Sequence, residues 1–184
     1  KMGAKALGTG AINLHPFVKG RAQLVMTKTP GFKQSLLGKG KTVVQSRIEA
    51  LGYDLFDTKV VAHREEDVAN ALDPKADIIL ILGASATSDR ADVAPAAVCR
   101  AGGTIDRFGM PVDPGNLLFL GRLKEASVVG LPGCARSPAL NGVDWVLERL
   151  AAGIAIDANT IANMGVGGLL KEMPGRPQPR RPKT

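Results

Sequence analysis

Short apolar stretches alternate with amphipathic segments along most of the chain. Stretches rich in aliphatic and β-branched residues predict strands at residues 23–27, 53–61, 77–82, 104–110, 117–120 and 127–130. Apolar residues at helical spacing predict helices over 42–51, 65–72, 94–101 and 136–152. We expect a further short helix over 158–164, capped by Asp157 and ended by Gly165.

The order of these elements indicates the fold class. Strands that alternate with helices of about ten residues form βαβ units, which build a parallel sheet with helices on both faces. Residues 77–82 are almost continuously apolar, as a strand covered on both faces requires, so we expect them at the centre of the sheet. The pattern therefore predicts a three-layer α/β/α fold with a mostly parallel sheet.

Composition divides the chain into four regions. Residues 23–153 carry the strand and helix pattern and form the predicted α/β domain, followed by a short helical extension over 154–173. Residues 1–22 show no sustained period and no acidic residue, and we expect them to be the remnant of a preceding region. Residues 174–184 contain four prolines, which is typical of a linker or tail.

Charge is distributed unevenly, which changes the meaning of the net charge of +7. Residues 1–42 hold eight bases and no acid, whereas residues 43–170 hold 11 bases and 16 acids. The basic segment has almost no interleaved aromatic residues, so we do not expect it to bind nucleic acid. No apolar run approaches the roughly 20 residues of a membrane span. With only two cysteines and no Cys/His cluster, we expect a cytoplasmic protein without a disulfide framework or zinc.

Candidate chemistry lies in three loops that are rich in small, turn-forming residues. Ligands of open α/β sheets bind outside the carboxyl ends of the strands, where loops and helix starts present unpaired N–H groups. The three loops span residues 83–95, 109–116 and 130–138. We expect them to converge at one rim of the sheet and line one pocket.

Two of these loops also have a purely structural interpretation. Asp92 offers a carboxylate to a ligand, but it is equally well placed to cap the helix that follows. The third loop is expected to end at a helix start, where N–H groups near Ser137 would hold a phosphate with help from Arg136. Ser137 before Pro138 is also ordinary helix-start chemistry, so each loop alone leaves both interpretations open.

Four motifs occur in an order that is known from one family. They are Gly83-Ala-Ser, Asp92-Val-Ala-Pro, Pro111-Val-Asp-Pro-Gly-Asn and Gly130-Leu-Pro-Gly-Cys. In this order they resemble the Gly-Gly-x-Ser/Thr, Asp-x-Thr, Lys-Pro-Gly-Lys and Gly-Leu-Pro-Gly-Asn motifs of the molybdopterin-binding domain family, and the similarity covers residues 23–152. The second and third loops and the Arg-Pro-Gln-Pro tail look like a bacterial subgroup in which this domain precedes a molybdenum cofactor cytidylyltransferase-like domain.

The resemblance implies a domain, often trimeric, that binds the pterin dithiolene and terminal phosphate of molybdopterin during molybdenum cofactor biosynthesis. It would present this pterin ligand to a nucleotidyltransferase partner domain of the same full-length chain. Carried over by position, the ligand-binding residues would be Gly83, Ser85, Asp89, Asp92, Pro114, Gly115, Asn116, Gly133, Cys134 and Ser137. For Cys134, contact with the ligand and simple steric replacement of an asparagine both stay open.

Two other functions are compatible with the same fold. Some relatives adenylate molybdopterin with Mg²⁺ and others insert molybdate, but family carboxylates are replaced here at positions that we expect to be Val44 and His63. A Mg²⁺-dependent enzyme would therefore need Asp89, Asp92 and Asp113 as substitutes, with Asp89 and Asp92 as catalytic candidates. The other alternative is a non-catalytic oligomerisation module.

Three further features are expected to be structural. Gly38-Lys-Gly-Lys-Thr42 ends like a Walker loop, but Ser35 stands where that motif needs glycine. His63 at a strand end is expected to be a solvated loop residue, with general-base chemistry as the alternative. Cys99 is expected on the apolar face of its helix, in the core.

Overall fold

The computed structural model describes residues 13–165. Their elements, in chain order, are β1 (Gly20–Lys28), α2 (Gln34–Ala50), β2 (Tyr53–Ala62), α3 (Glu65–Ala71), β3 (Ile78–Leu82), α4 (Val93–Arg100), β4 (Thr104–Phe108), β5 (Phe119–Leu123), β6 (Ala126–Leu131), the 3-10 helix η1 (Gly133–Arg136), α5 (Gly142–Ala151) and α6 (Ala158–Asn163). The predicted linker over 174–184 lies outside the described residues, as does part of the predicted extension over 154–173.

One sheet organises the domain, with the strand order β2-β1-β3-β6-β5-β4. The pairs β1/β2, β1/β3 and β3/β6 are parallel, while β5 runs antiparallel to both β6 and β4. All five residues of β3 are buried, as the continuous apolar run predicts. The predicted central strand and the mostly parallel sheet are therefore confirmed.

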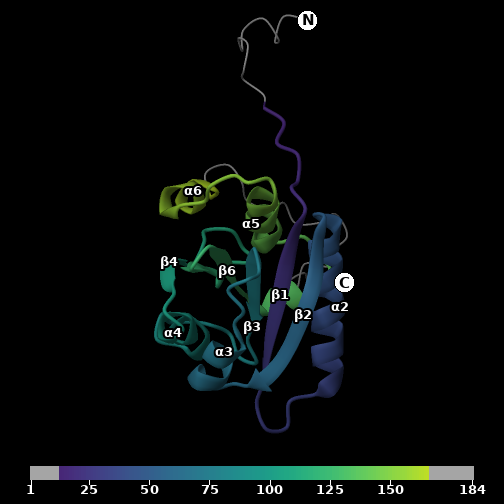
Figure 1. Ribbon diagram of the computed structural model, residues 1–184, viewed down its shortest axis with the longest axis vertical. Coiled ribbons are helices and arrows are strands. Elements are labelled where there is room, and N and C mark those ends of the chain that lie inside the picture. Colours follow the sequence, from purple (N-terminus) through teal and green to yellow (C-terminus); the bar gives the residue numbers. More distant parts are fainter. Residues whose placement is uncertain (1–12, 166–184) are drawn as a thin grey trace, which may run out of the picture.

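Helices cover both faces of the sheet, and alternate residues of the strands face opposite ways. Leu80 of β3 packs into the apolar cluster that includes residues of α2, α5 and α6. Its neighbours Ile79 and Ile81 pack into a second cluster that includes residues of α3 and α4. In Figure 1, α2 lies on one side of the sheet and α3 and α4 on the other. The three-layer α/β/α prediction is thus confirmed.

Helix α2 is longer than the sequence pattern predicts, because it begins at Gln34 rather than at Thr42. Gly40 lies on its buried face, where an added Cβ would be 3.0 Å from Leu82 Cδ2, so this glycine permits close helix–sheet packing instead of breaking the helix. The Walker-like segment therefore lies inside a helix. Val44 is buried in the middle of α2. The family carboxylate that Val44 was expected to replace lies in the turn before the first helix, so this expected correspondence is wrong.

Helix α5 is shorter than predicted, because it begins at Gly142 rather than at Arg136. Asn141 caps it through a bond from the Val143 N–H, and the Asp144 carboxylate accepts the Asn141 N–H in return. The preceding residues form η1 and an irregular segment. The expected helix start at Ser137 is therefore wrong, and so is the expected core position of Cys99, which is exposed. Helix α6 and its Asp157 cap are confirmed.

Candidate functional site

Four parallel strands, β1, β2, β3 and β6, end at the same edge of the sheet. This edge lies at the lower end of the domain in Figure 1, opposite the N-terminal segment. The loops that follow β3 and β6 at this edge contain seven of the sequence-predicted residues: Gly83, Ser85, Asp89, Asp92, Gly133, Cys134 and Ser137. Carboxyl edges of this kind present loop N–H groups and side chains to ligands.

A chain of hydrogen bonds joins the ends of β1, β2 and β3. The Thr27 hydroxyl lies 2.8 Å from His63 Nδ1, and His63 Nε2 lies 3.0 Å from Ser85 Oγ. The Ala84 N–H donates to Thr27 Oγ1 over 2.7 Å. Thr27 is buried, His63 is half-buried and Ser85 is exposed. The expectation that His63 is a solvated loop residue is wrong, because both of its ring nitrogens are engaged.

Arg136 connects the loop after β6 to the end of β3. Its Nη2 donates to the Gly83 carbonyl over 2.6 Å, and its guanidinium lies 5.9 Å from the centre of the Phe32 ring. Within residues 13–165, no carboxylate pairs with Arg136, and its buried Nε has no hydrogen-bond partner. Burial lowers the pKa of the Arg136 guanidinium from its usual high value, but arginine stays charged at neutral pH. The edge therefore holds a half-buried, uncompensated positive charge.

A small hollow of about 210 Å³ lies beside Arg136. It is lined by Leu36, Lys39, Gly133, Cys134, Arg136 and Ser137. Two of these residues are basic and none is acidic, so the lining favours a negatively charged group. The hollow includes three of the sequence-predicted residues, Gly133, Cys134 and Ser137.

The carboxylates of the first loop accept hydrogen bonds from backbone N–H groups of the same loop. The Asp92 side chain accepts N–H bonds from Ser88 over 2.6 Å and from Asp89 over 3.0 Å, and these bonds lower the pKa of the Asp92 carboxyl. The Asp89 side chain accepts the Ala91 N–H over 2.7 Å. Asp92 occupies the position before α4, yet it makes no side-chain capping bond, so the capping interpretation is wrong.

The second loop packs against the start of α5. The Pro114 carbonyl accepts the Gly142 N–H over 2.8 Å, and the Asn116 carbonyl accepts the Met110 N–H over 3.0 Å. Gly115 has a φ of +126°, and an added Cβ would lie 2.8 Å from Gly142 N. Glycine is thus required here for chain packing.

The structure brings the three loops together in pairs. The bond from Arg136 to Gly83 joins the first loop to the third. Between the second and third loops the link is electrostatic: burial raises the pKa of the Cys134 thiol, and the negative charge of Asp113 raises it further. No hydrogen bond or ion pair joins the first loop to the second within the described part of the chain. Among the described residues, a direct bond thus joins only the first and third loops, and the convergence of all three at one rim stays a prediction.

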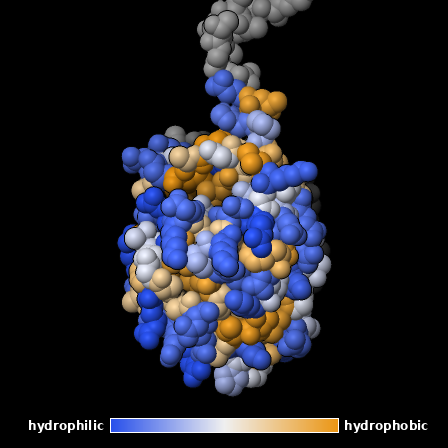
Figure 2. Space-filling view, in the orientation of Figure 1, coloured by the Kyte–Doolittle hydropathy of each residue, from blue (hydrophilic) through white to orange (hydrophobic). Residues whose placement is uncertain are grey.

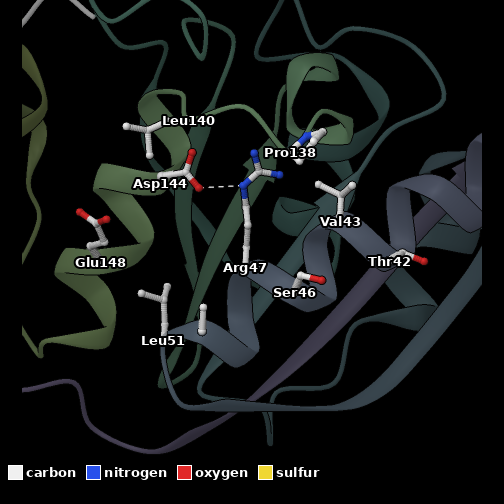
Figure 3. A pocket seen from close by; sticks show the side chains of 10 residues that line it. Thr42, Val43, Ser46, Arg47, Leu51, Pro138, Leu140, Asp144 and Glu148 are labelled. Atoms are coloured by element: carbon white, nitrogen blue, oxygen red, sulfur yellow. Dashed lines mark hydrogen bonds and ion pairs between the residues drawn. The ribbon is translucent and has the colours of Figure 1, made fainter.

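Arg47 of α2 fixes the shape of the third loop, and its sequence context gave no signal of this role. Its guanidinium donates to the carbonyls of Ala135, Ser137 and Ala139 over 2.7, 2.6 and 2.9 Å. Its Nε also pairs with Asp144 Oδ1 of α5 over 2.7 Å. Figure 3 shows this ion pair at a groove of about 510 Å³ that is lined by residues of α2, by Leu51 directly after it, and by residues of α5 and the segment before α5. Apolar side chains such as Val43 and Leu140 line that groove.

Residues 13–165 contain neither a cluster of metal-ligating side chains nor a helix that could span a membrane. Between residues 13 and 165, no group of three or more His, Cys, Asp or Glu side chains is placed to hold a metal ion. In this same part of the chain, no helix has the length and apolar character needed to cross a membrane. Polar and apolar residues are mixed over the face seen in Figure 2.

No family model and no curated protein matches this chain. Among solved structures, it is similar to the molybdopterin biosynthesis MoeA protein of Pyrococcus horikoshii, with a TM-score of 0.53 and 22% identity over 72% of this chain and 36% of that one. It also matches the molybdopterin biosynthesis enzyme MoaB of Thermus thermophilus, with a TM-score of 0.42 and 14% identity over 72% and 88% of the two chains. The chain thus spans about a third of the length of the MoeA protein, and the likeness to that protein shows a shared fold.

Proposed function

We propose that this chain is a molybdopterin-binding domain that acts in molybdenum cofactor biosynthesis. Three observations support the proposal: the ordered motifs, the fold shared with part of a molybdopterin biosynthesis protein, and a donor set suited to an anion at the carboxyl edge of the sheet. The observation that carries most weight is the half-buried guanidinium of Arg136, which has no carboxylate partner in residues 13–165. A buried charge of this kind is costly unless a partner compensates it.

The residues at this edge fit the terminal phosphate of molybdopterin. Arg136 and Lys39 supply positive charge to the hollow beside Gly133, and Ser85 supplies a hydroxyl from the end of β3. A guanidinium makes strong, directional hydrogen bonds with phosphate oxygens. Cys134 and Ser137 also line the hollow, whereas Asp89 and Asp92 hold the first loop in shape.

The second loop is proposed to contact the rest of the ligand. Pro114, Gly115 and Asn116 lie in the same loop as Asp113, whose charge raises the pKa of the Cys134 thiol. In the full-length protein, the domain would present the bound pterin to a nucleotidyltransferase domain, and the homo-oligomer would be a trimer. These finer proposals derive from the resemblance of the motifs.

Calorimetric titration with molybdopterin tests the proposal. We expect Arg136→Met to weaken binding at least about tenfold, which corresponds to about 1.4 kcal/mol. Arg122→Met is the matched control, because Arg122 is an exposed arginine on β5 that pairs with Asp106. Unchanged affinity in a folded Arg136→Met variant would contradict the site. Gly115→Val is a poor test, because its side chain would clash with Gly142 and disturb the fold.

A Mg²⁺-dependent adenylyl or molybdenum transferase is the enzymatic alternative. It needs Asp89, Asp92 and Asp113 to converge on one ion. Asp89 and Asp92 instead accept N–H bonds from their own loop, and Asp113 lies near Cys134. Turnover of ATP with molybdopterin and Mg²⁺ would establish this alternative. A stable oligomer without pterin binding, measured by light scattering and calorimetry, would favour the oligomerisation module.

A further inference from the structure

The hydrogen-bond chain from Thr27 through His63 to Ser85 runs from the interior of the sheet to its surface. Thr27 is fully buried on β1, His63 follows β2, and Ser85 follows β3. The two distances along the chain, 2.8 and 3.0 Å, are those of ordinary hydrogen bonds. Three side chains from separate strands therefore form one connected unit, and the direction of its hydrogen bonds decides what Ser85 offers to a ligand.

The buried end of the chain sets that direction. Thr27 Oγ1 already accepts the Ala84 N–H, and the hydroxyl has one proton to donate. Among the described residues, His63 Nδ1 is the one acceptor that bonds to this hydroxyl. If Nδ1 carried a proton, the Thr27 hydroxyl proton would be buried without a partner, which is strongly disfavoured. Thr27 therefore donates to Nδ1, and neutral His63 carries its proton on Nε2.

The exposed end of the chain follows from this tautomer. The Nε2–H group donates to Ser85 Oγ, so the Ser85 hydroxyl proton points away from the imidazole. In a Ser-His-Asp triad the histidine nitrogen accepts the serine proton, and a carboxylate accepts the proton on the other nitrogen. Here the Thr27 hydroxyl, a donor, takes the place of that carboxylate, so the hydrogen bonds run in the opposite direction, from Thr27 through His63 to Ser85.

We propose that Thr27 and His63 are positioning residues that hold Ser85 as a hydrogen-bond donor for an anionic oxygen such as that of a phosphate monoester, and that Ser85 is not a nucleophile. The proposal deepens the proposed function and rests on it for the identity of the ligand. It adds Thr27, which no sequence motif assigns to the site, and it gives His63 a positioning role in place of general-base chemistry. The bond from Arg136 to the Gly83 carbonyl places a positive charge at the same strand end.

Nitrogen-15 NMR of the ring nitrogens tests the direction of the chain without any ligand. His15 is an exposed internal reference, because the chain has two histidines, and His15→Gln assigns the signals. At about pH 8, where an ordinary histidine is neutral, we expect His63 to be protonated on Nε2, with the Nδ1 signal displaced from that of His15 by hydrogen bonding. Thr27→Ser should keep this displacement and Thr27→Val should remove it. A proton on Nδ1, or an Nδ1 signal insensitive to Thr27→Val, would overturn the inference.

Two further measurements examine Ser85 itself. An organophosphorus fluoride should leave Ser85 unlabelled, and an adduct on Ser85 would overturn its assignment as a donor. Titration with inorganic phosphate should shift the amide signals of residues 84 and 85, with at least fivefold weaker binding in Ser85→Ala. Ser46→Ala, at an exposed position of α2, is the matched control and should bind as the parent does.

These outcomes separate the inference from the proposed function. Equal phosphate binding by the parent and Ser85→Ala, or no phosphate binding by the parent, would overturn the donor role. Failure of molybdopterin to bind, with the phosphate and nitrogen-15 results as expected, would contradict the proposed function alone.

Discussion

Replacing Arg47 by alanine should destabilise the domain far more than replacing an ordinary surface arginine. The Arg47 side chain is 10% exposed and its partner Asp144 is 14% exposed, so their ion pair is nearly buried. Breaking a buried pair by removing one partner costs about 3–5 kcal/mol, because the other charge is left uncompensated. Arg47 also satisfies three carbonyls of the loop before α5.

The structure places the expected cost at the lower end of that range. Without Arg47, Asp144 still accepts the Asn141 N–H over 2.8 Å, and water can reach the exposed carbonyls of Ser137 and Ala139. We therefore expect Arg47→Ala to lower the free energy of unfolding by about 3 kcal/mol. For a chain of this size, the melting temperature should fall by about 6–12 °C.

Urea denaturation followed by circular dichroism measures this change. Arg122→Ala is the control, because the Arg122 side chain is 68% exposed in its ion pair with Asp106, and exposed pairs contribute at most about 1 kcal/mol. A double-mutant cycle of Arg47→Met with Asp144→Asn should give a coupling energy above that of the exposed pair. If Arg47→Ala costs no more than Arg122→Ala, the assignment of Arg47 as the residue that holds the third loop is refuted.

Three more outcomes are expected. Gly130→Ala should lower the free energy of unfolding by about 1–3 kcal/mol in urea denaturation, because the new Cβ would clash with the ring of buried Phe119. N–H bonds from its own loop lower the pKa of the Asp92 carboxyl. The ionised carboxylate should therefore stabilise the fold at any pH above the ordinary aspartate pKa, and this stabilisation should disappear as the pH falls through the lowered pKa. Asp92→Asn should remove that part of the acid dependence of urea unfolding. Because burial raises the pKa of the Cys134 thiol, a disulfide reagent at neutral pH should modify exposed Cys99 first, and the rate at Cys134 should increase with pH.

Each of these outcomes has a result that contradicts it. Unchanged stability of Gly130→Ala would mean that β6 and Phe119 separate without cost. An acid titration of the Asp92 carboxyl at its ordinary pKa, measured by NMR, would mean that the loop bonds are absent in solution. Faster modification of Cys134 than of Cys99 would show an accessible thiolate in the third loop.

The local sequence was sufficient to predict features that depend on apolar periodicity or on contacts within one turn. The continuous apolar run of β3 records a strand that is covered on both faces, and the alternation of strands with helices records the layers. The Asp157 cap of α6 is a contact within one turn, so the four residues 157–160 specify it. None of these features depends on which strand lies next to which.

The bounds of helices α2 and α5 were not predicted correctly from the sequence pattern and became clear only in the tertiary structure. Gly40 is locally typical of a helix breaker, yet it lies on the buried face of α2 because Leu82 and Met26 of two strands come close to it. Likewise, the start of α5 is set by the capping box of Asn141 and Asp144, and Arg47 holds the segment before it from another helix. Leu82, Met26 and Arg47 are distant in sequence from the segments they contact, so no local pattern reveals these contacts. The capping box itself is a local pattern, with Asn141 and Asp144 three residues apart.

The candidate site shows the same division. The sequence indicated that small-residue loops follow β3 and β6, because turn-forming residues mark the ends of strands. Only the strand order places Thr27, His63 and Ser85 in one series of hydrogen bonds, since β1 lies between β2 and β3 in the sheet although α2 and α3 separate these three strands along the sequence. Apolar periodicity is a local property of the sequence, whereas hydrogen-bond partners across a parallel sheet are decided by which strands become neighbours when the chain folds.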